Sequence, residues 1–283
     1  MAGYPPLATW LRAWSRPLAP LATGLPARGG RLSNIRGVVF DLYGTLFVSA
    51  AGELACHHTD DCIENFHANL RAAETKFPSG LAPAAALTAA IHAEHARLRA
   101  TGNIHPEIDI LTIWRDILPA ATSTAEIELI ALAWECATNP VWPMPNLGPT
   151  LQCLHEAGVL LGIASNAQFF TPLLFEAFLD APSSSLGFHP DLCRWSFQEG
   201  TAKPGLRLFE LVAAALPALG LVPNNILFLG NDLRNDVLPA AATGFQTALF
   251  AGDARSLRLR NQPPPATVVT DLAAIPSLIG LSG

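Results

Sequence analysis

From residue 147 onward, short apolar runs alternate with longer segments in which apolar residues recur at helical spacing. Short apolar runs are typical of strands buried on both faces, and this alternation implies a parallel sheet covered by helices on both sides. One more apolar run, at 35–40, precedes the alternating region. We therefore predict an α/β fold with a doubly wound parallel sheet, with strands at 35–40, 159–164, 193–197, 226–229, 247–250 and 268–269, and helices at 147–157, 169–178, 206–219 and 236–243.

Residues 51–143 have a different pattern, because Glu, His, Ala and Leu recur there at helical spacing without a convincing strand. Breaks at Pro and Gly separate the expected helices at 60–77, 83–100, 108–118 and 124–137. A block of helices between the first strand and the rest of a sheet is an insertion. We predict three parts, which are an N-terminal arm (1–34), a core (35–50 and 144–283) and an inserted helical cap (51–143).

Composition and charge exclude several classes of protein. The chain has 283 residues, of which 50% are hydrophobic, enough for one large domain with a smaller insertion. The formal net charge of −6 provides no basic surface for nucleic acid. No apolar run approaches the roughly 18 residues that a membrane-spanning helix needs. The expected partner is a small anionic molecule, and the sequence does not specify an oligomeric state.

The first 34 residues contain five prolines and no Asp or Glu. The prolines interrupt the apolar core that a signal peptide needs, so we expect an arm that packs on the domain or stays loose. A membrane-surface helix at 7–14 is the alternative. A cytoplasmic location follows by default. The five cysteines lack a C-x-x-C pair and are expected to be free thiols in a reducing compartment.

Polar residues occur at the ends of several expected strands. In an open parallel sheet, ligands bind at the carboxyl ends of the strands, so folding gathers these residues at one edge. Four such segments predict one site. They are Asp41-Leu42-Tyr43-Gly44-Thr45, Ser165-Asn166, Lys203-Pro204, and residues 230–236 with Asn231, Asp232 and Asp236.

The motifs in these segments resemble those of the haloacid dehalogenase-like (HAD) hydrolase superfamily over about residues 35–48 and 145–272. The cap matches by position only. The resemblance implies a Rossmann-like core and an enzyme that hydrolyses its substrate, without specifying that substrate. The similar motifs are V-V-F-D-L-Y-G-T-L around Asp41, A-S-N at 164–166, A-K-P at 202–204 and the acidic F-L-G-N-D-L-R-N-D at 228–236.

The residue types suit the chemistry that the resemblance implies. The first Asp of the first motif, Asp41, attacks phosphorus or a carbon bearing a leaving group, which divides one difficult step into two. Gly44 permits a tight turn that brings backbone amides to the substrate anion. Lys203 offsets the charge of an anionic substrate beside an anionic nucleophile. Hydrogen bonds to that anion are expected from Ser165 and Asn166.

Tyr43 departs from the usual first motif. Most phosphatases of the superfamily have a second Asp two residues after the nucleophile, which acts as general acid and base. Loss of a positioned acid reduces the rate by about 10²–10⁴, mainly for leaving groups that need a proton. Tyrosine at this place is typical of the dehalogenases of the family, whose halide leaving group needs none. We include Tyr43 in the catalytic set.

The fourth motif favours a metal-dependent phosphatase instead. Asn231, Asp232 and Asp236 place an amide and two carboxylates at one strand end, and hard oxygen ligands of this kind suit Mg²⁺. Direct ligands are expected from Asp41, the backbone carbonyl of Tyr43, and Asp232 or Asn231. Asp236 is expected to hold a coordinated water or to orient the lysine, and its structural alternative is a helix N-cap.

Further substrate contacts are expected from Thr45, beside the tight turn, and from Arg115 in the cap. An arginine in the cap can reach a substrate carboxylate or phosphate, and a surface arginine beside a core tryptophan is the alternative. Most of the histidines also lie in the cap, but no known zinc-ligand spacing is met, so solvated helix-face histidines are the better interpretation. They are His57, His58, His67, His92, His95 and His105.

Three functions are compatible with the sequence. The first is a Mg²⁺-dependent phosphohydrolase that acts on a small phosphorylated metabolite through an aspartyl-phosphate. The second is a metal-independent 2-haloacid dehalogenase, which Tyr43 favours. The third is a weakly catalytic module that binds a phosphorylated ligand or a partner protein, suggested by Tyr43 and Asn231. We expect the first, and the substrate stays unidentified because the cap has no readable motif.

Overall fold

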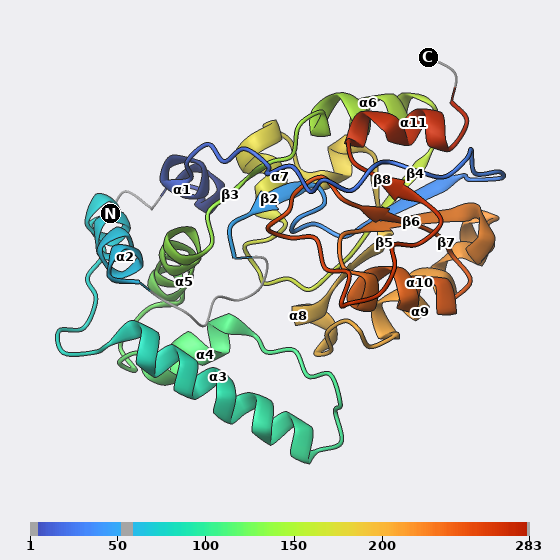
Figure 1. Cartoon of the computed structure of the whole chain (residues 1–283). Coiled ribbons are helices and arrows are strands. Elements are labelled where there is room, and N and C mark those ends of the chain that lie inside the picture. The colour runs from blue at the N-terminus through green and yellow to red at the C-terminus, as the bar shows by residue number, and fades with distance from the viewer. Residues whose placement is uncertain (1–4, 52–58, 282–283) are drawn as a thin grey trace.

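The computed structural model describes residues 5–51 and 59–281, and a six-stranded parallel sheet lies at its centre (Figure 1). Its strands are β1 (Gly37–Phe40), β4 (Leu160–Ser165), β5 (Phe188–Trp195), β6 (Ile226–Gly230), β7 (Gln246–Phe250) and β8 (Val268–Val269). The spatial order is β5-β4-β1-β6-β7-β8. The first strand therefore pairs with both β4 and β6, and the carboxyl ends of these three strands lie side by side.

Both faces of the sheet are buried. Successive residues of a strand point to opposite faces, and Val38 and Phe40 belong to a different core cluster from Val39. Helices α6 and α11 lie on one side of the sheet, and α9 and α10 on the other (Figure 1), which confirms the predicted doubly wound α/β fold. The helices of this part are α6 (Leu147–Glu156), α7 (Leu173–Leu179), α8 (Ser196–Glu199), α9 (Arg207–Ala215), α10 (Leu238–Ala242) and α11 (Ile275–Leu278).

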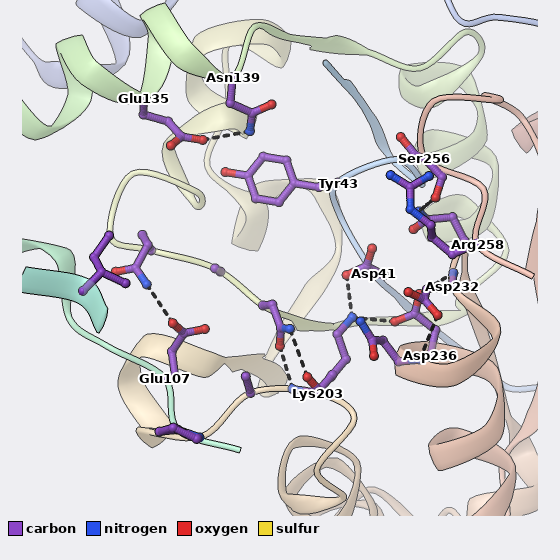
Figure 2. Close-up of a pocket in the computed structure, with 18 of the residues that line it drawn as sticks. Asp41, Tyr43, Glu107, Glu135, Asn139, Lys203, Asp232, Asp236, Ser256 and Arg258 are labelled. Carbon is purple, nitrogen blue, oxygen red and sulfur yellow. Dashed lines mark hydrogen bonds and ion pairs between the residues drawn. The ribbon is translucent and has the colours of Figure 1, made fainter. Parts of the chain in front are cut away.

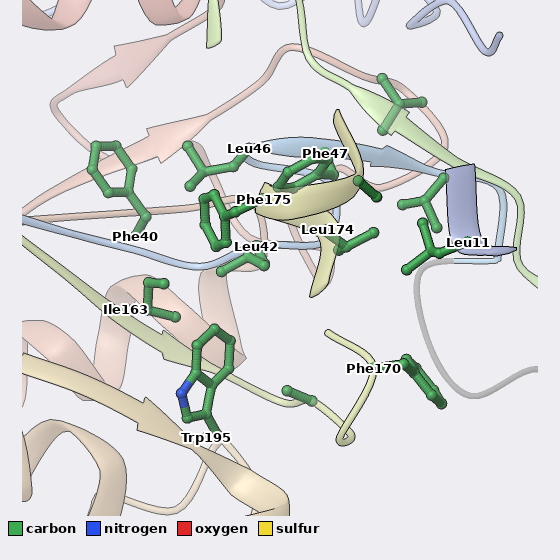
Figure 3. Packing of buried hydrophobic residues seen from close by; sticks show 14 of the residues in the cluster. Leu11, Phe40, Leu42, Leu46, Phe47, Ile163, Phe170, Leu174, Phe175 and Trp195 are labelled. Atoms are coloured by element: carbon green, nitrogen blue, oxygen red, sulfur yellow. The ribbon is translucent and has the colours of Figure 1, made fainter. Parts of the chain in front are cut away.

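Aromatic side chains fill the core beside β1 (Figure 3). Phe175 of α7 meets Phe47 edge-to-face, with ring centroids 5.6 Å apart and an interplanar angle of 81°. Such pairs contribute about 0.5–1.5 kcal/mol beyond the burial of area. Leu42 and Leu46 are buried in the same cluster. The turn that follows β1 is thus held by its apolar residues, which fixes the position of the polar residues between them.

Among the described residues, four helices occupy the segment 60–138, which we call the helical insertion. They are α2 (Asp60–Ala72), α3 (Pro83–Ala100), α4 (Ile110–Ile117) and α5 (Thr124–Thr138). Helix α5 begins at a capping box, in which Ser123 and Glu126 each accept a hydrogen bond from the other's backbone amide. Phe66, Trp114 and Trp134 pack together inside the insertion.

Two short antiparallel strands flank the insertion, β2 (Phe47–Ser49) and β3 (Val141–Pro143). The prediction that residues 51–143 contain no strand is therefore wrong at β3. The sequence signal of β3 is weak because the strand has three residues and ends in a proline, which has no amide hydrogen for the ladder.

Several other boundaries differ from the prediction. The helix expected at 236–243 begins earlier, because Asp232 caps a π-helical turn (Leu233–Val237) that runs into α10. The helix expected at 169–178 begins later, at Leu173, because turns precede it. The strand expected at 193–197 is β5, which begins at Phe188 and is followed by α8. Short 3₁₀ segments occupy Ser183–Leu186, Leu216–Leu219, Pro223–Asn225 and Leu272–Ala274.

The described part of the N-terminal segment, residues 5–34, packs on the rest of the molecule. Helix α1 (Leu7–Trp14) contacts both α5 and α7, and Leu11 is buried there. Further along, Arg28 forms a β-bridge with Val268. No helix in the described part of the chain is long and apolar enough to cross a membrane.

Candidate active site

A cavity of about 350 Å³ lies between the carboxyl ends of the strands and the helical insertion (Figure 2). Each of the four polar segments predicted from the sequence contributes to its wall, because parallel strands bring their carboxyl ends to one edge. The strand side of the wall includes Asp41, Tyr43, Asn166, Lys203, Asn231, Asp232 and Asp236, and the insertion side includes Ile91, His92, His95, Glu107 and Glu135.

Asp41 is the first residue after β1, and its amide donates to the carbonyl of Leu229 in β6. Its carboxylate oxygen Oδ1 accepts hydrogen bonds from Ser165 Oγ at 3.0 Å and from Lys203 Nζ at 2.6 Å. The second oxygen, Oδ2, accepts none from the described residues. Asp41 is 7% exposed, so it has one anchored oxygen and one oxygen that is available to a ligand in the cavity.

Lys203 lies between two carboxylates. Its Nζ donates to Asp41 Oδ1 and to Asp236 Oδ1, each at 2.6 Å, and to the carbonyl of Ala164 at 3.1 Å. Burial lowers the pKa of Lys203, but Asp236 and Asp41 more than offset this and hold it above its ordinary value. The lysine is therefore charged and satisfies its three donors with protein oxygens.

Asp236 completes this buried charge cluster. Its Oδ1 accepts from Lys203, and its Oδ2 accepts from the backbone amide of Asp232 at 2.9 Å. Burial raises the pKa of Asp236, Lys203 opposes that rise, and the nearby Asp41 adds to it. Both oxygens of Asp236 are thus bound by protein donors, and the side chain orients Lys203 directly.

Ser165 and Asn166 hydrogen-bond to Asp41 and to the backbone of Lys203. Ser165 Oγ donates to Asp41. Asn166 makes a reciprocal pair with the backbone of Lys203, accepting from its amide at 2.7 Å and donating to its carbonyl at 3.3 Å. In the structure these side chains position Asp41 and Lys203, and their hydrogen bonds to a substrate anion stay a prediction.

Gly44 and Thr45 form the turn after the nucleophile. Gly44 has φ +80°, and a Cβ there would lie 2.3 Å from Cβ of Ser256 and 2.7 Å from Nδ2 of Asn231, so only glycine fits. Thr45 is fully buried, and its Oγ1 donates to Asn231 Oδ1 at 3.1 Å. Thr45 therefore orients Asn231 and does not line the cavity.

Asp232 lies in the cavity wall but is engaged by protein groups. Its Oδ1 accepts from the amides of Arg234 and Asn235 as an N-cap, and its Oδ2 accepts from Arg260 at 2.6 Å. Within the described residues, no three His, Cys, Asp or Glu side chains are grouped so that they could hold a metal ion. Three oxygens at the strand end remain as candidate metal ligands: Oδ2 of Asp41 and the carbonyl of Tyr43, which accept no hydrogen bond from the described residues, and Oδ1 of Asn231, which accepts one from Thr45.

Tyr43 is directed from the strand end toward the insertion (Figure 2). Its hydroxyl hydrogen-bonds with Thr171 Oγ1 at 3.0 Å. Burial is the largest cause that raises the pKa of Tyr43 well above its ordinary value, and Glu135 and Asp41 also raise it. The phenol is therefore neutral, and it is not poised to exchange a proton at neutral pH.

A family model described as haloacid dehalogenase-like hydrolase matches residues 35–244. The chain belongs to this family. The match spans Asp41, Lys203 and the fourth motif, and the protein is accordingly a HAD-like hydrolase.

Curated and structural relatives agree with this placement. A phosphoglycolate phosphatase from Salmonella paratyphi A is 31% identical over 224 residues, which is 76% of this chain and 80% of the relative. A 2-haloacid dehalogenase from Pseudomonas syringae shares the fold, with a TM-score of 0.54, 18% identity, and coverage of 87% of this chain and 98% of its own. A HAD phosphatase from Thermococcus onnurineus has a TM-score of 0.51, 17% identity, and coverage of 87% and 98%.

Several residues of this hydrolase site were not predicted from the sequence. Glu135 and Glu107 line the cavity from the insertion side, and Ser256 and Arg258 from the loop after β7. A signal for Glu135 exists, because it is a lone acid between apolar residues on a helix. The others lie in loops, where no periodicity marks a buried residue.

The side chain of Arg115 does not line the cavity. Helix α4 buries Ile110, Ile113 and Trp114, so Arg115, one position further around the helix, is exposed to solvent. The alternative of a surface arginine beside a core tryptophan describes it. Of the histidines, His92 and His95 line the cavity, whereas His57 and His58 lie outside the described residues.

Proposed function

We propose that the protein is a Mg²⁺-dependent phosphohydrolase that uses Asp41 as its nucleophile on a small phosphorylated metabolite. One observation carries the proposal: Asp41 has one oxygen fixed by Ser165 and Lys203 and the other free toward the cavity. The phosphatase relatives support phosphoryl chemistry, and the name of those relatives makes phosphoglycolate one substrate to test.

The residues present support a two-step reaction. Oδ2 of Asp41 attacks phosphorus, a P–O bond forms, and the bond to the leaving oxygen breaks with its electron pair. Water then attacks the aspartyl-phosphate, releases inorganic phosphate and restores the carboxylate. Lys203 keeps Oδ1 in place and reduces the repulsion between the anionic nucleophile and the anionic phosphoryl group.

Mg²⁺ would be held by the carboxylate of Asp41, the carbonyl of Tyr43 and Asn231, with Asp232 and Asp236 outside the direct set. This all-oxygen set with one carboxylate fits Mg²⁺, which keeps several waters and takes further oxygens from substrate phosphate. When bound, the ion supplies neutralisation of the charge that develops on the phosphoryl oxygens.

We also propose that the helical insertion acts as a cap, as its position over the strand ends suggests (Figure 2), and that the protein works in a reducing, cytoplasmic compartment. Cys62, Cys136, Cys153 and Cys193 are free thiols, and Cys56 lies outside the described residues. The free thiols support the second proposal.

A 2-haloacid dehalogenase is the second candidate, and Tyr43 favours it. A panel of aryl and acyl phosphates with Mg²⁺ or with chelator, followed by 2-haloacids, separates the candidates. Metal-dependent phosphate release supports the phosphohydrolase, and chelator-resistant halide release supports the dehalogenase. No turnover, together with thermal stabilisation by a phosphorylated ligand, supports a binding module.

Asp41→Asn is expected to abolish turnover without unfolding the protein, because it removes charge and retains shape. The loss should be at least about 10³-fold, as for other nucleophiles. The exposed Asp116 provides the matched control, and Asp116→Asn should retain full activity. Near-normal turnover by Asp41→Asn, with an unchanged melting temperature, would show that the covalent mechanism is wrong.

A further inference from the structure

The cavity differs in charge between its two sides (Figure 2). The strand side of the wall carries the cations Lys203 and Arg258 beside the carboxylates of Asp41, Asp232 and Asp236, and the proposed function places the phosphoryl group there. Glu107 and Glu135 line the cavity from the helical insertion, and within the described residues no lysine or arginine of the insertion lines it. Cations that can offset an anionic group therefore lie at the strand side only, and the insertion side opposes such a group.

Glu135 has a fixed orientation. Oδ1 of Asn139 accepts from Ser49 Oγ at 2.7 Å and from the amide of Ala51 at 3.1 Å. Because those two donors define the oxygen of the Asn139 amide, its Nδ2 must face Glu135, and it donates to Oε1 at 2.8 Å. Oε2 of Glu135 has no donor among the described residues. One oxygen of the carboxyl group is thus anchored and the other is open to a ligand.

The carboxyl group of Glu135 has a partner for only one of its two oxygens. Apart from Glu135 and Thr138, the buried residues of helix α5 are apolar, and Glu135 is 7% exposed. A buried polar group without a full set of hydrogen bonds costs free energy. Burial accordingly raises the pKa of Glu135 to about 7. A ligand that donates a hydrogen bond to Oε2 would remove part of this cost.

The neighbouring groups do not compensate the charge of Glu135. Both oxygens of Glu107 are occupied, Oε2 by Ser196 Oγ at 2.6 Å and Oε1 by Gln168 Nε2 at 3.2 Å, so this carboxylate adds negative charge without offering a donor. Burial, followed by Arg99, lowers the pKa of His95, so its imidazole is neutral near pH 7.

We propose that Glu135 makes this site select phosphate esters whose leaving group ends in a neutral hydrogen-bond donor and discriminate against those that end in a carboxylate. Phosphoglycolate, which gives the curated relatives their name, ends in a carboxylate and is therefore expected to be a poor substrate of this protein. The proposal rests on the phosphohydrolase function proposed above. The phosphoryl end of the ester lies at Lys203 and Arg258. The other end meets Oε2 of Glu135, which accepts from a hydroxyl or amide and repels a carboxylate.

Two aryl phosphates of the same shape test this selection. The esters 4-carbamoylphenyl phosphate and 4-carboxyphenyl phosphate differ in one charged group, and the rigid ring carries that group away from the phosphoryl end. At about pH 8, above the pKa of Glu135, kcat/KM is expected to be at least about tenfold higher for the carbamoyl ester, the size of a modest like-charge penalty. Equal values, or a preference for the carboxy ester, overturn the proposal.

Glu135→Gln identifies the responsible side chain. The intrinsic reactivity of each ester is the same for every variant, so a change in the ratio of the two kcat/KM values isolates the substitution. Glu135→Gln should raise turnover of the carboxy ester and lower the ratio toward the value set by the intrinsic reactivities of the two esters. Glu128→Gln, on the same helix but away from the cavity, should leave the ratio unchanged. A ratio that persists in Glu135→Gln overturns the role of Glu135.

A binding measurement separates this proposal from the phosphohydrolase function. If neither ester is hydrolysed with Mg²⁺, the phosphohydrolase function fails, and calorimetry on Asp41→Asn still compares their dissociation constants. Tighter binding of the carbamoyl ester supports the selection by Glu135, whereas equal binding overturns it. The comparison of the two esters on the wild-type protein uses no variant, so the proposal stays testable even if Glu135→Gln does not fold.

Discussion

Tyr43 is the single residue that most affects the proposed chemistry. It occupies the place where similar phosphatases carry a general acid, and its hydroxyl is bound to Thr171. Burial raises its pKa well above the ordinary value for tyrosine, so it is a poor proton donor to a leaving oxygen at neutral pH. The structure thus strengthens what the sequence indicated, because the side chain at this place does not replace the missing acid.

The leaving-group dependence of the rate tests this role of Tyr43. We expect acyl and aryl phosphates, which leave as weak bases, to be hydrolysed at least about 10²-fold faster than alkyl sugar phosphates, the size of a lost general acid. A plot of log kcat/KM against the pKa of the leaving group should have a steep negative slope. A flat plot would show that another group supplies the proton.

Lys203 stabilises the buried cluster that it forms with Asp41 and Asp236 and also takes part in the proposed reaction. Lys203→Met removes the cation between Asp41 and Asp236 and leaves two buried carboxylates facing each other. Removing one partner of a buried ion pair costs about 3–5 kcal/mol, so the free energy of unfolding in urea should fall by that amount. Adding Asp236→Asn removes one of the stranded charges and should restore part of the stability, while activity stays lost. A double variant no more stable than Lys203→Met would contradict this account.

At the scale of elements, the π-helical turn after β6 decides which residues would face the proposed metal ion. Asp232 caps that turn and pairs with Arg260, and Thr45 orients Asn231 instead. The sequence alone predicts either Asn231 or Asp232 as a direct Mg²⁺ ligand without choosing between them. The choice depends on where the helix starts, and the predicted start at 236 was wrong by three residues.

Exchanging the two side chains tests this assignment. Asn231→Asp adds a carboxylate to the proposed ligand set and should lower the Mg²⁺ concentration for half-maximal activity by about tenfold, because affinity follows ligand charge. Asp232→Asn should leave that concentration within about twofold, because Asn caps a helix about as well as Asp, and should reduce stability by no more than about 1 kcal/mol through the lost ion pair with Arg260. Titration with Mg²⁺ and urea unfolding measure both effects. Loss of Mg²⁺ activation in Asp232→Asn would make Asp232 the ligand.

The elements that the sequence predicts well are those with a strong period. Five of the six sheet strands and the helices of the insertion fall where apolar spacing places them. A strand buried on both faces is a continuous apolar run, and a helix buried on one face has apolar residues at helical spacing, so both are visible in the sequence. Motif spacing likewise brings Asp41 and Lys203 to one edge. Strand β3, with its proline, and Glu135, whose partner is Asn139, depend on tertiary contacts, which no local pattern encodes.

At the scale of the whole molecule, the N-terminal segment joins the two parts of the fold. Helix α1 contacts α5 of the insertion and α7 beside the sheet. Trp10 and Trp14 stack with centroids 5.1 Å apart, and Arg12 lies over Trp142 at 5.0 Å. The sequence shows an apolar stripe on this helix but not the surface that receives it, because an amphipathic pattern specifies burial without specifying the partner.

The buried side chain of Leu11 makes this joint testable. Leu11 is 3% exposed and belongs to the cluster that extends from α1 to Phe175 and Trp134. Leu11→Ala removes buried methyl groups and leaves a cavity, so the free energy of unfolding should fall by about 2–5 kcal/mol. Leu21, in the same segment, is 53% exposed, and Leu21→Ala should change stability by no more than about 0.5 kcal/mol.

Because α5 also carries Glu135, loosening α1 should reduce the preference for the carbamoyl ester along with the stability. If Leu11→Ala lowers stability and leaves that preference unchanged, α1 stabilises the fold without positioning the insertion over the strand ends. If it changes neither, the segment is an arm whose packing contributes nothing to the folded state.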